Sequence, residues 1–436
     1  MKSCIHPWLG VCADLEKQGS AGMTYYFSKD KNFYKNTDPQ QLASEYGTPL
    51  YVYNEEIFRA RCREMVNLVP YENFKVTYSM KANSNLKLLK MAHQEGLHAD
   101  AMSPGEIYFL EKAGFSPDEI FYISNNVSDE EMKFAIDRRI MTSVDSLSQL
   151  RRYGRLNPGG KVCVRFNPGV GAGHHEKVVT AGKATKFGVN QDKTDEVKVI
   201  LKKYGLKLAG INQHIGSLFM EGDKYLESVR SILATAAEFE DIEFVDFGGG
   251  FGIPYKKQEG QERLELKQFG RSFAYLLNEW TDRYGKKIIF RIEPGRYISA
   301  ECCILLGDVY VRKNNYEKTF IGTDLGFYAL VRPVMYDSHH EVEVYRNGKL
   351  IEGGDTEVAT IVGNICESGD IVAKERELPV IEEGDVIGVM DAGAYGYSMS
   401  SNYNNRLRPA EVLITAEGSV ELIRRRDTLE DLIRNF

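Results

Sequence analysis

Short apolar runs alternate with amphipathic stretches between about residues 54 and 305 of the chain. Runs rich in β-branched and aromatic residues lie at positions 74–79, 120–124, 141–144, 161–166, 208–214, 244–247 and 287–292. Between these runs, apolar residues recur with the period of an amphipathic helix, at positions 85–95, 104–113, 128–138, 146–153 and 224–239. This alternation predicts a parallel sheet with crossover helices. About eight repeats over ~250 residues predict a closed, TIM-type α/β barrel.

The pattern changes after about residue 305. Short β segments lie at positions 309–311, 340–345, 357–362 and 421–423, with turn signals at Asn347-Gly348 and Gly353-Gly354. They predict a C-terminal antiparallel β domain. Positions 48–53 predict a strand that packs with this β domain, followed by a helix with Asn54 as its N-cap. The predicted organisation is a tail at 1–22, this strand segment at 23–53, the barrel at 54–305 and the β domain at 306–436.

Composition narrows the class of protein. The chain has 436 residues, 43% of them hydrophobic and 27% charged, which is typical of a globular protein. Its net charge of −7 lacks the basic field of a nucleic-acid binder. No apolar stretch is long enough for a transmembrane helix. The seven cysteines do not have the spacing of a zinc site, so we expect free thiols. The apolar patch before Asp14 is too short for a signal peptide, so we expect a cytoplasmic protein. Met23 is an alternative start.

The ends of the predicted barrel strands carry unusual polar residues. Lys81 closes the run at 74–79, where burial is expected to lower the pKa of its amine and favour imine formation. His214 ends a later run and is followed by Gly216-Ser217. Taken singly, a surface lysine and a hydrogen-bonded core histidine are the more common explanations of such residues. Functional residues of α/β barrels nevertheless gather at these strand ends.

Two further strand ends favour an anion site beside a carboxylate. Gly248–Gly250 follow one run, and glycines there let backbone N–H groups surround a phosphate. Glu293 ends the last run and is followed by Gly295-Arg296, so its buried charge would need a cationic partner. A lysine, a phosphate cup and a carboxylate together fit pyridoxal phosphate, which needs a Schiff-base lysine and a group that tunes its pyridine nitrogen.

A series of ordered motifs carries a family resemblance. They are YSMKAN at 78–83, RFNPG at 165–169, KFG at 186–188, HIGS at 214–217, GGGFG at 248–252, EPGR at 293–296, RP at 332–333, CES at 366–368 and DAGAYG at 391–396. The chain resembles the pyridoxal-phosphate decarboxylases of the alanine-racemase fold (fold type III), most closely the diaminopimelate decarboxylases. The resemblance extends from about residue 47 to 425. It implies an alanine-racemase-like barrel with a C-terminal β domain.

The resemblance implies a role for each matched residue. The cofactor would be bound by Lys81, His214, Ser217, Gly250, Glu293, Gly295, Arg296 and Tyr395. Among these, Lys81 would form the imine, His214 would stack on the ring and Glu293 would pair with the pyridine nitrogen. The remaining ones would surround the phosphate. Cys366 would come from the partner subunit of a homodimer and donate a proton, so that Lys81 and Cys366 are the implied catalytic residues.

Substrate choice within the family would depend on few residues. The resemblance implies that Arg296, Arg332 and Tyr336 hold a substrate carboxylate, that Tyr395 also binds the substrate, and that Glu367 recognises the amino group beside the carboxylate. Two arginines suit a dicarboxylic amino acid, because guanidinium binds carboxylate in a bidentate manner. The chain departs from the family's pattern at Asn364-Ile365 and at residues 324–327 (DLGF), both near the implied site.

The resulting hypothesis is decarboxylation of meso-2,6-diaminopimelate to L-lysine and carbon dioxide, the last step of lysine biosynthesis. Alternatives are the same chemistry on ornithine, lysine, arginine or a D-amino acid, a non-catalytic homologue, and a racemase. Intact Lys81 and Cys366 count against the non-catalytic homologue, and the Cys-Glu-Ser motif counts against the racemase. His174-His175 is interpreted as a polar loop over the barrel mouth, without a metal, and Cys302-Cys303 as packing of an apolar strand.

Overall fold

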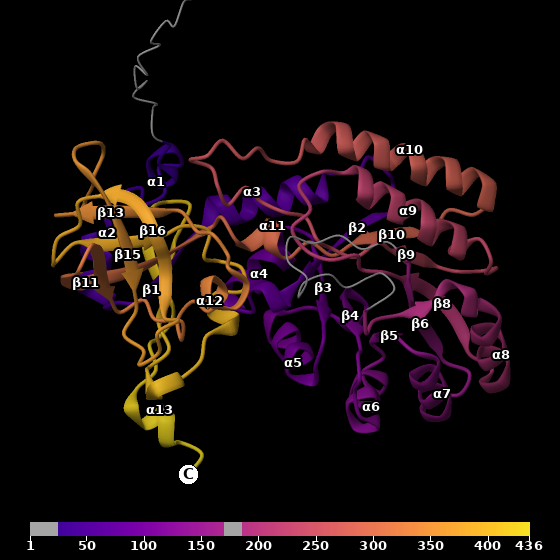
Figure 1. The fold of residues 1–436 in the computed structure, drawn as a ribbon. Helices are drawn as coiled ribbons and strands as arrows, with labels where there is room; N and C mark the ends of the chain where they lie inside the picture. Colours follow the sequence, from indigo (N-terminus) through magenta and orange to yellow (C-terminus); the bar gives the residue numbers. More distant parts are fainter. Residues whose placement is uncertain (1–24, 170–184) are drawn as a thin grey trace, which may run out of the picture.

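Two sheets organise the chain in the computed structural model, which describes residues 25–169 and 185–436 (Figure 1). The predicted His174-His175 loop, the alternative start at Met23 and the tail at 1–22 lie outside the described residues. One sheet is closed into a barrel, and the other is a separate, mostly antiparallel sheet. The helix pair α3 (Glu55–Val66) and α11 (Arg296–Ser299) lies between the two sheets in Figure 1.

Eight parallel strands form the barrel in the order β5-β4-β3-β2-β10-β9-β8-β6, and pairing of β5 with β6 closes it. They are β2 (Phe74–Ser79), β3 (His98–Ala101), β4 (Ile120–Ile123), β5 (Met141–Val144), β6 (Lys161–Asn167), β8 (Lys207–Asn212), β9 (Phe244–Asp246) and β10 (Ile289–Ile292). A two-residue strand, β7 (Val189–Asn190), pairs with β6 only. The predicted closed α/β barrel is confirmed. Strand β3 was not among the predicted runs, because its His-Ala-Asp-Ala sequence is only weakly apolar.

Helices surround the barrel on its outside (Figure 1). They are α4 (Leu86–Gln94), α5 (Pro104–Ala113), α6 (Asp129–Asp137), α7 (Leu147–Leu156), α8 (Thr194–Tyr204), α9 (Asp223–Ala236) and α10 (Leu266–Tyr284). Side-chain caps begin several of them, since a serine or asparagine oxygen satisfies a backbone N–H of the first turn. The predicted cap of α3 is present, because the Asn54 side chain accepts a hydrogen bond from the Ile57 N–H at 3.0 Å.

The second sheet has ten strands, drawn from both ends of the sequence. They are β1 (Leu50–Asn54), β11 (Cys303–Asn315), β12 (Lys318–Thr323), β13 (Val342–Arg346), β14 (Lys349–Leu350), β15 (Thr356–Val362), β16 (Ile371–Pro379), β17 (Val386–Val389), β18 (Ala410–Ile414) and β19 (Val420–Arg424). Strand β1 pairs antiparallel with β11 and parallel with β18. Strands β12 and β15 are also parallel, so the sheet is mixed, with antiparallel pairs in the majority.

Short helices complete the chain. They are α1 (Phe27–Asp30), α2 (Pro39–Tyr46), α12 (Arg332–Tyr336) and α13 (Leu429–Ile433), with 3₁₀ turns η1 (Met80–Ala82), η2 (Pro117–Glu119), η4 (Gln191–Lys193), η5 (Tyr397–Met399) and η6 (Tyr403–Asn405). Within the described ranges, no helix is both long enough and apolar enough to cross a membrane.

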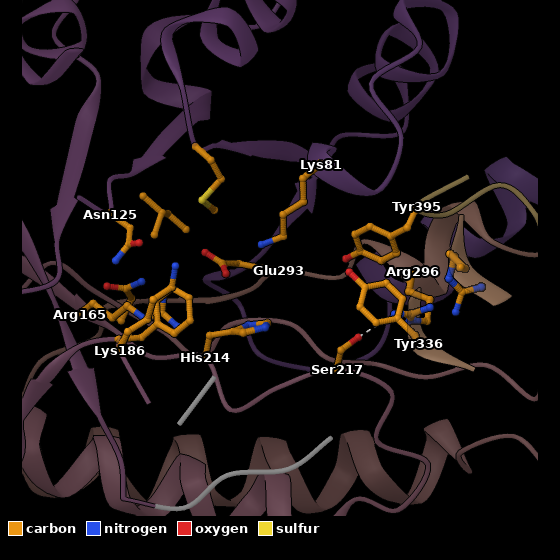
Figure 2. A pocket seen from close by; sticks show the side chains of 15 residues that line it. Lys81, Asn125, Arg165, Lys186, His214, Ser217, Glu293, Arg296, Tyr336 and Tyr395 are labelled. Carbon is orange, nitrogen blue, oxygen red and sulfur yellow. Dashed lines mark hydrogen bonds between the residues drawn. The ribbon is translucent and has the colours of Figure 1, made fainter. Parts of the chain in front are cut away.

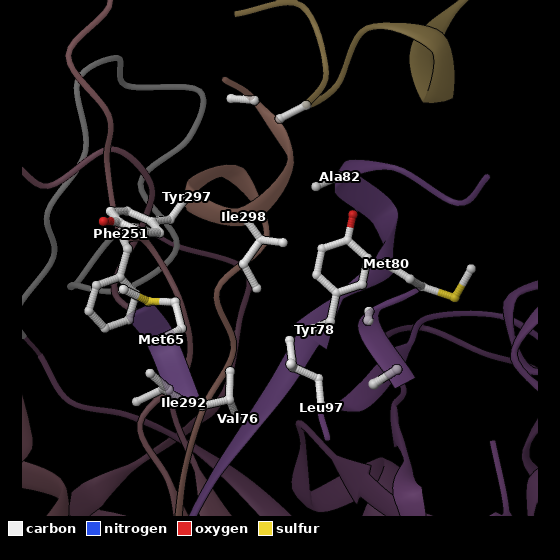
Figure 3. Packing of buried hydrophobic residues seen from close by; sticks show 14 of the residues in the cluster. Met65, Val76, Tyr78, Met80, Ala82, Leu97, Phe251, Ile292, Tyr297 and Ile298 are labelled. Carbon is white, nitrogen blue, oxygen red and sulfur yellow. The ribbon is translucent and has the colours of Figure 1, made fainter. Parts of the chain in front are cut away.

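Buried contacts fix the turn η1 between the barrel and the second sheet. Figure 3 shows Tyr78 beside Ile298 of α11, with Met80 on the other side of Tyr78, and these residues and Ala82 are buried. The Tyr395 N–H donates to the Ala82 carbonyl at 2.8 Å. The Asn83 amide donates to the Gly393 carbonyl at 2.9 Å, so two hydrogen bonds tie the segment at Ala82 and Asn83 to the segment that follows β17 of the second sheet. These contacts hold Lys81, the residue between Met80 and Ala82, at a defined position.

Candidate active site

A cavity of about 420 Å³ opens where the carboxyl ends of the barrel strands meet the second sheet (Figure 2). The predicted residues that line it are Lys81, His214, Ser217, Glu293, Arg296, Arg332, Tyr336 and Tyr395. In Figure 2, Lys81 and Glu293 lie at the centre, with Arg165 towards one end and Tyr336 and Arg296 towards the other. The tertiary structure thus brings together side chains that lie as much as 314 positions apart in the sequence, from Lys81 to Tyr395.

Lys81 belongs to the turn η1 that follows β2, and Asp100 of β3 lies beside it. The Asp100 carboxylate is fully buried and accepts hydrogen bonds from the Ser79 hydroxyl at 2.8 Å and the Met80 N–H at 3.2 Å. Burial, the largest single effect, lowers the pKa of Lys81, but the charges of Asp100, Tyr395 and Glu293 together outweigh it and raise that pKa above its ordinary value. The predicted lowering was therefore wrong, because the sequence pattern did not reveal Asp100.

Glu293 follows β10 and presents a buried carboxyl group to the cavity. Its side chain is 4% exposed, and its Oε1 atom has no hydrogen-bond partner among the residues that the structure describes. Burial, followed by the charges of Asp246 and Asp100, raises the pKa of Glu293 well above its usual range, although Lys81 opposes this. The expected cationic partner, Lys81, thus only partly offsets the effects that favour the protonated form of Glu293. Its orphaned oxygen is suited to an N–H group brought by a ligand.

His214 lies two residues beyond β8, with the glycine run against it. The Gly249 N–H donates to His214 Nδ1 at 3.1 Å, and burial lowers the pKa of His214 well below its usual value, so the imidazole is neutral. A Cβ atom on Gly248, which has φ +73°, would lie 2.4 Å from the Gln213 carbonyl oxygen. Glycine is therefore required for the close approach that places this ring at the cavity wall.

The end of the cavity that contains Arg296 is cationic. Arg296 Nη2 donates to the Ser217 hydroxyl at 3.0 Å, and its guanidinium carbon lies 4.9 Å from the Tyr395 ring centroid. The predicted Gly250 has φ +109°, and a Cβ there would lie 2.6 Å from the Gly216 carbonyl oxygen. Gly295 directly precedes Arg296 and is its helix cap. Side-chain and backbone donors for an anion therefore gather here.

Arg332 adds a second buried guanidinium at this end of the cavity. It begins α12 and is 1% exposed, while Tyr336 ends the same helix and also lines the cavity. Within residues 25–169 and 185–436, neither Arg296 nor Arg332 forms an ion pair with a carboxylate; their hydrogen bonds go to neutral groups. Two buried positive charges without a protein counterion favour binding of an anionic ligand.

Cys366 and Glu367 lie outside this cavity. They belong to the loop between β15 and β16, and both are exposed. The Cys366 thiol lies 3.4 Å from Asn404 Oδ1, and the Tyr403 hydroxyl donates to Glu367 Oε1 at 2.5 Å. Within one chain, the structure does not bring these two predicted residues to Lys81.

The cavity wall also contains residues to which the sequence analysis assigned no role, although Arg165, Lys186 and Phe187 lie in the quoted motifs RFNPG and KFG. They are Met102, Ile123, Asn125, Arg165, Lys186, Phe187 and Asn212. Arg165 is 7% exposed, and its guanidinium carbon lies 4.6 Å from the Phe187 ring centroid. Arg165 and Asn212 lie near the carboxyl ends of β6 and β8, so the strand-end rule that selected Lys81 and Glu293 could have found them.

The arrangement fits pyridoxal phosphate. Lys81 supplies the amine, the orphaned Glu293 oxygen faces the cavity for a pyridine N–H, and the neutral His214 ring lies at the wall. Ser217, Arg296 and Tyr395 supply donors for a phosphate. These are the groups that this cofactor needs from a protein.

Comparisons with known proteins agree with this chemistry. Residues 55–300 match the family model "Pyridoxal-dependent decarboxylase, pyridoxal binding domain". The chain is 43% identical to the diaminopimelate decarboxylase of Methanothermobacter thermautotrophicus, over 91% of this chain and 93% of the relative. A crystal structure of a diaminopimelate decarboxylase aligns with a TM-score of 0.83 and 31% identity, covering 91% of this chain and 95% of that one. The Helicobacter pylori diaminopimelate decarboxylase complexed with L-lysine aligns with a TM-score of 0.82 and 29% identity, over 91% and 98% of the two chains.

Proposed function

The chain belongs to the diaminopimelate decarboxylases of the pyridoxal-dependent decarboxylase family, and from this premise we propose that it converts meso-2,6-diaminopimelate to L-lysine and carbon dioxide. The observation that carries the choice of substrate is the pair of buried arginines, Arg296 and Arg332, without a carboxylate partner among the described residues. A substrate with a second carboxylate would supply the missing counterion.

Pyridoxal 5'-phosphate is the proposed cofactor. When bound, it supplies an electron sink for the charge left on a carbon that loses its carboxylate. Lys81 would hold it covalently, His214 would lie against its ring, and Glu293 would share a proton with its pyridine nitrogen. The phosphate would be bound by Ser217, Gly250, Gly295, Arg296 and Tyr395.

The residues of the chain would orient the substrate around this group. Arg332, Tyr336 and Arg296 would hold the carboxylate that the substrate keeps, while Tyr395 closes the same end of the cavity. The carboxylate that leaves would then lie at the other end of the substrate, near Lys81. Burial of the arginines strengthens their attraction for the retained carboxylate, because few waters screen it.

A homodimer would complete the site. Cys366 and Glu367 are exposed and outside the cavity of their own chain, which supports their delivery to the cavity of a second copy. Cys366 of the partner subunit would donate a proton to the carbon that has lost carbon dioxide. Glu367 of the partner subunit would pair with the substrate amino group beside the retained carboxylate.

The test is release of carbon dioxide from a panel of amino acids by the purified protein supplied with pyridoxal phosphate. We expect turnover of meso-diaminopimelate and little or none of lysine, ornithine or arginine. Faster turnover of lysine or ornithine would overturn the dicarboxylate assignment and support a decarboxylase of another amino acid. Absence of turnover on the whole panel, with cofactor bound, would support a non-catalytic homologue.

A further inference from the structure

A buried histidine supports Arg332 from the side away from the cavity. His340 is 2% exposed and does not line the cavity. Arg332 Nη1 donates a hydrogen bond to His340 Nε2 at 2.7 Å, and Arg332 Nη2 donates to the Ser338 hydroxyl at 3.3 Å. His340 Nδ1 lies 2.7 Å from the Met390 carbonyl oxygen, which comes directly after β17. His340 therefore links Arg332 to the backbone of the second sheet.

The partners of His340 determine its tautomer. A guanidinium has only N–H donors, so Nε2 must accept and carry no proton. A carbonyl oxygen can only accept, so Nδ1 must carry the proton. A neutral Nδ1–H imidazole is the only form that satisfies both contacts. Burial and the neighbouring charge of Arg332 lower the pKa of His340 well below its usual value, in agreement with this form.

Tyr255 completes a neutral lining around both guanidiniums. Arg296 Nη1 donates to the Tyr255 hydroxyl at 2.9 Å, and the Arg332 guanidinium carbon lies 4.7 Å from the Tyr255 ring centroid. The edge of the His340 ring packs against Tyr255, with ring centroids 5.3 Å apart. An acidic residue in either place would neutralise an arginine internally, whereas neutral acceptors fix its direction and leave its charge for a ligand.

We propose that His340 is a positioning residue for substrate recognition: its Nδ1–H tautomer holds Arg332 in the orientation that binds the carboxylate retained in the product. The inference rests on the proposed function, since it takes Arg332 to bind that carboxylate. His340 touches neither substrate nor cofactor in this assignment and acts through Arg332. Its effect is confined to ligands that carry the retained carboxylate.

Two product-sized ligands separate this role from a general structural one. L-Lysine has the retained carboxylate, and cadaverine is the same diamine chain without it. Inhibition constants are measured for both ligands on the holoenzyme. The difference between the two constants therefore measures how much the carboxylate contact contributes to binding. We expect His340→Leu to weaken inhibition by L-lysine about tenfold, because it removes a hydrogen bond to a charged group, and to change inhibition by cadaverine less than about twofold. KM for meso-diaminopimelate should rise more than kcat falls.

A conservative variant and a control test the acceptor itself. His340→Gln can again present an acceptor to Arg332, and we expect it to recover L-lysine inhibition to within about threefold of the unmodified enzyme. His339→Gln changes the adjacent histidine, which is hydrogen-bonded to Arg376 instead, and should leave both inhibition constants unchanged. Arg332→Met tests the premise, and should weaken L-lysine at least as much as His340→Leu does.

These outcomes distinguish failure of the proposed carboxylate binding by Arg332 from failure of the positioning role proposed for His340. If Arg332→Met leaves L-lysine inhibition unchanged, the arginine clamp and the role of His340 both fail. If Arg332→Met weakens L-lysine but His340→Leu does not, or if His340→Leu weakens cadaverine equally, only the positioning role is overturned. Should His340→Leu not fold, ¹⁵N NMR of histidine-labelled unmodified enzyme decides the question. A neutral Nδ1–H signal for His340 supports the inference, and an Nε2–H or doubly protonated ring overturns it.

Discussion

The barrel mouth and the Cys366 loop are built in opposite ways, although both carry residues of one predicted site. At the barrel mouth, Asp100, Glu293 and Arg332 are buried, and Asp100 and Arg332 are hydrogen-bonded within the chain. In the loop, Cys366 and Glu367 are exposed and are contacted by Tyr403 and Asn404.

The difference indicates which part of the site one chain can complete. Buried charges at the barrel mouth are oriented before any ligand arrives, as binding of a charged cofactor and substrate requires. In the loop, Cys366 and Glu367 are exposed and do not line the cavity of their own chain. They are thus accessible to something that docks against the loop, and a second copy of this chain is the proposed occupant. Each prediction below perturbs one of these two regions.

The largest effect is expected at Lys81. In Lys81→Ala the holoenzyme should lose its covalently bound cofactor, with the visible absorption of the imine, and activity should fall by at least about a thousandfold. The fold should survive, because Asp100 keeps its hydrogen bonds from Ser79 and the Met80 N–H, although loss of the Lys81 charge beside it should lower thermal stability. Absorption spectra before and after borohydride check the result, with the surface variant Lys87→Ala as control. A borohydride-reducible cofactor retained by Lys81→Ala would contradict the assignment.

The second prediction tests the two regions together. Cys366→Ala should be inactive alone, but mixing it with Lys81→Ala should restore activity. With random subunit exchange, about a quarter of the sites would then have both residues intact, if each site takes one residue from each chain. The measurement is carbon dioxide release before and after proven exchange. No recovery would place Cys366 in its own chain's site or outside any site.

The third prediction perturbs only the cationic end of the barrel mouth. Arg332→Ala removes a buried positive charge that would pair with the substrate carboxylate, and we expect kcat/KM on meso-diaminopimelate to fall at least about tenfold. The visible spectrum of the bound cofactor should be retained, because Lys81 and Glu293 are untouched. Arg283→Ala on the exposed face of α10 is a matched control without an expected effect. Loss of cofactor together with activity would instead indicate a role in binding the cofactor.

The smallest effect is expected in the loop. Tyr403→Phe removes the hydrogen bond to Glu367 but keeps the ring that stacks on Phe327, with centroids 5.4 Å apart. Because the pair is exposed, we expect KM to rise only about two- to fivefold with kcat nearly unchanged. Tyr275→Phe, on an exposed tyrosine of α10, is the control. An unchanged KM would show that Glu367 needs no support from Tyr403.

The departures from the family's pattern also lie beside the loop. Phe327, in the segment at 324–327, stacks on Tyr403, and the Asn364 carbonyl accepts a hydrogen bond from Arg406 at 3.0 Å. Ile365 is buried. Both departures therefore lie in or against the Cys366 loop, and none of these residues lines the cavity.

The sequence alone determined the barrel, because eight β–α units leave a periodic record of apolar positions that local interactions and burial impose. It also determined Lys81, His214, Glu293 and Arg296 as strand-end candidates, since parallel strands bring their carboxyl ends to one face. Only the tertiary structure revealed Asp100, which lies in a weakly apolar strand and, together with Tyr395 and Glu293, reverses the expected pKa shift of Lys81. It alone placed Cys366 outside the cavity and His340 behind Arg332. Cys366 and His340 both lie outside the repeating strand–helix pattern of the barrel. Their positions depend on contacts between residues far apart in the sequence, and no local sequence pattern records such contacts.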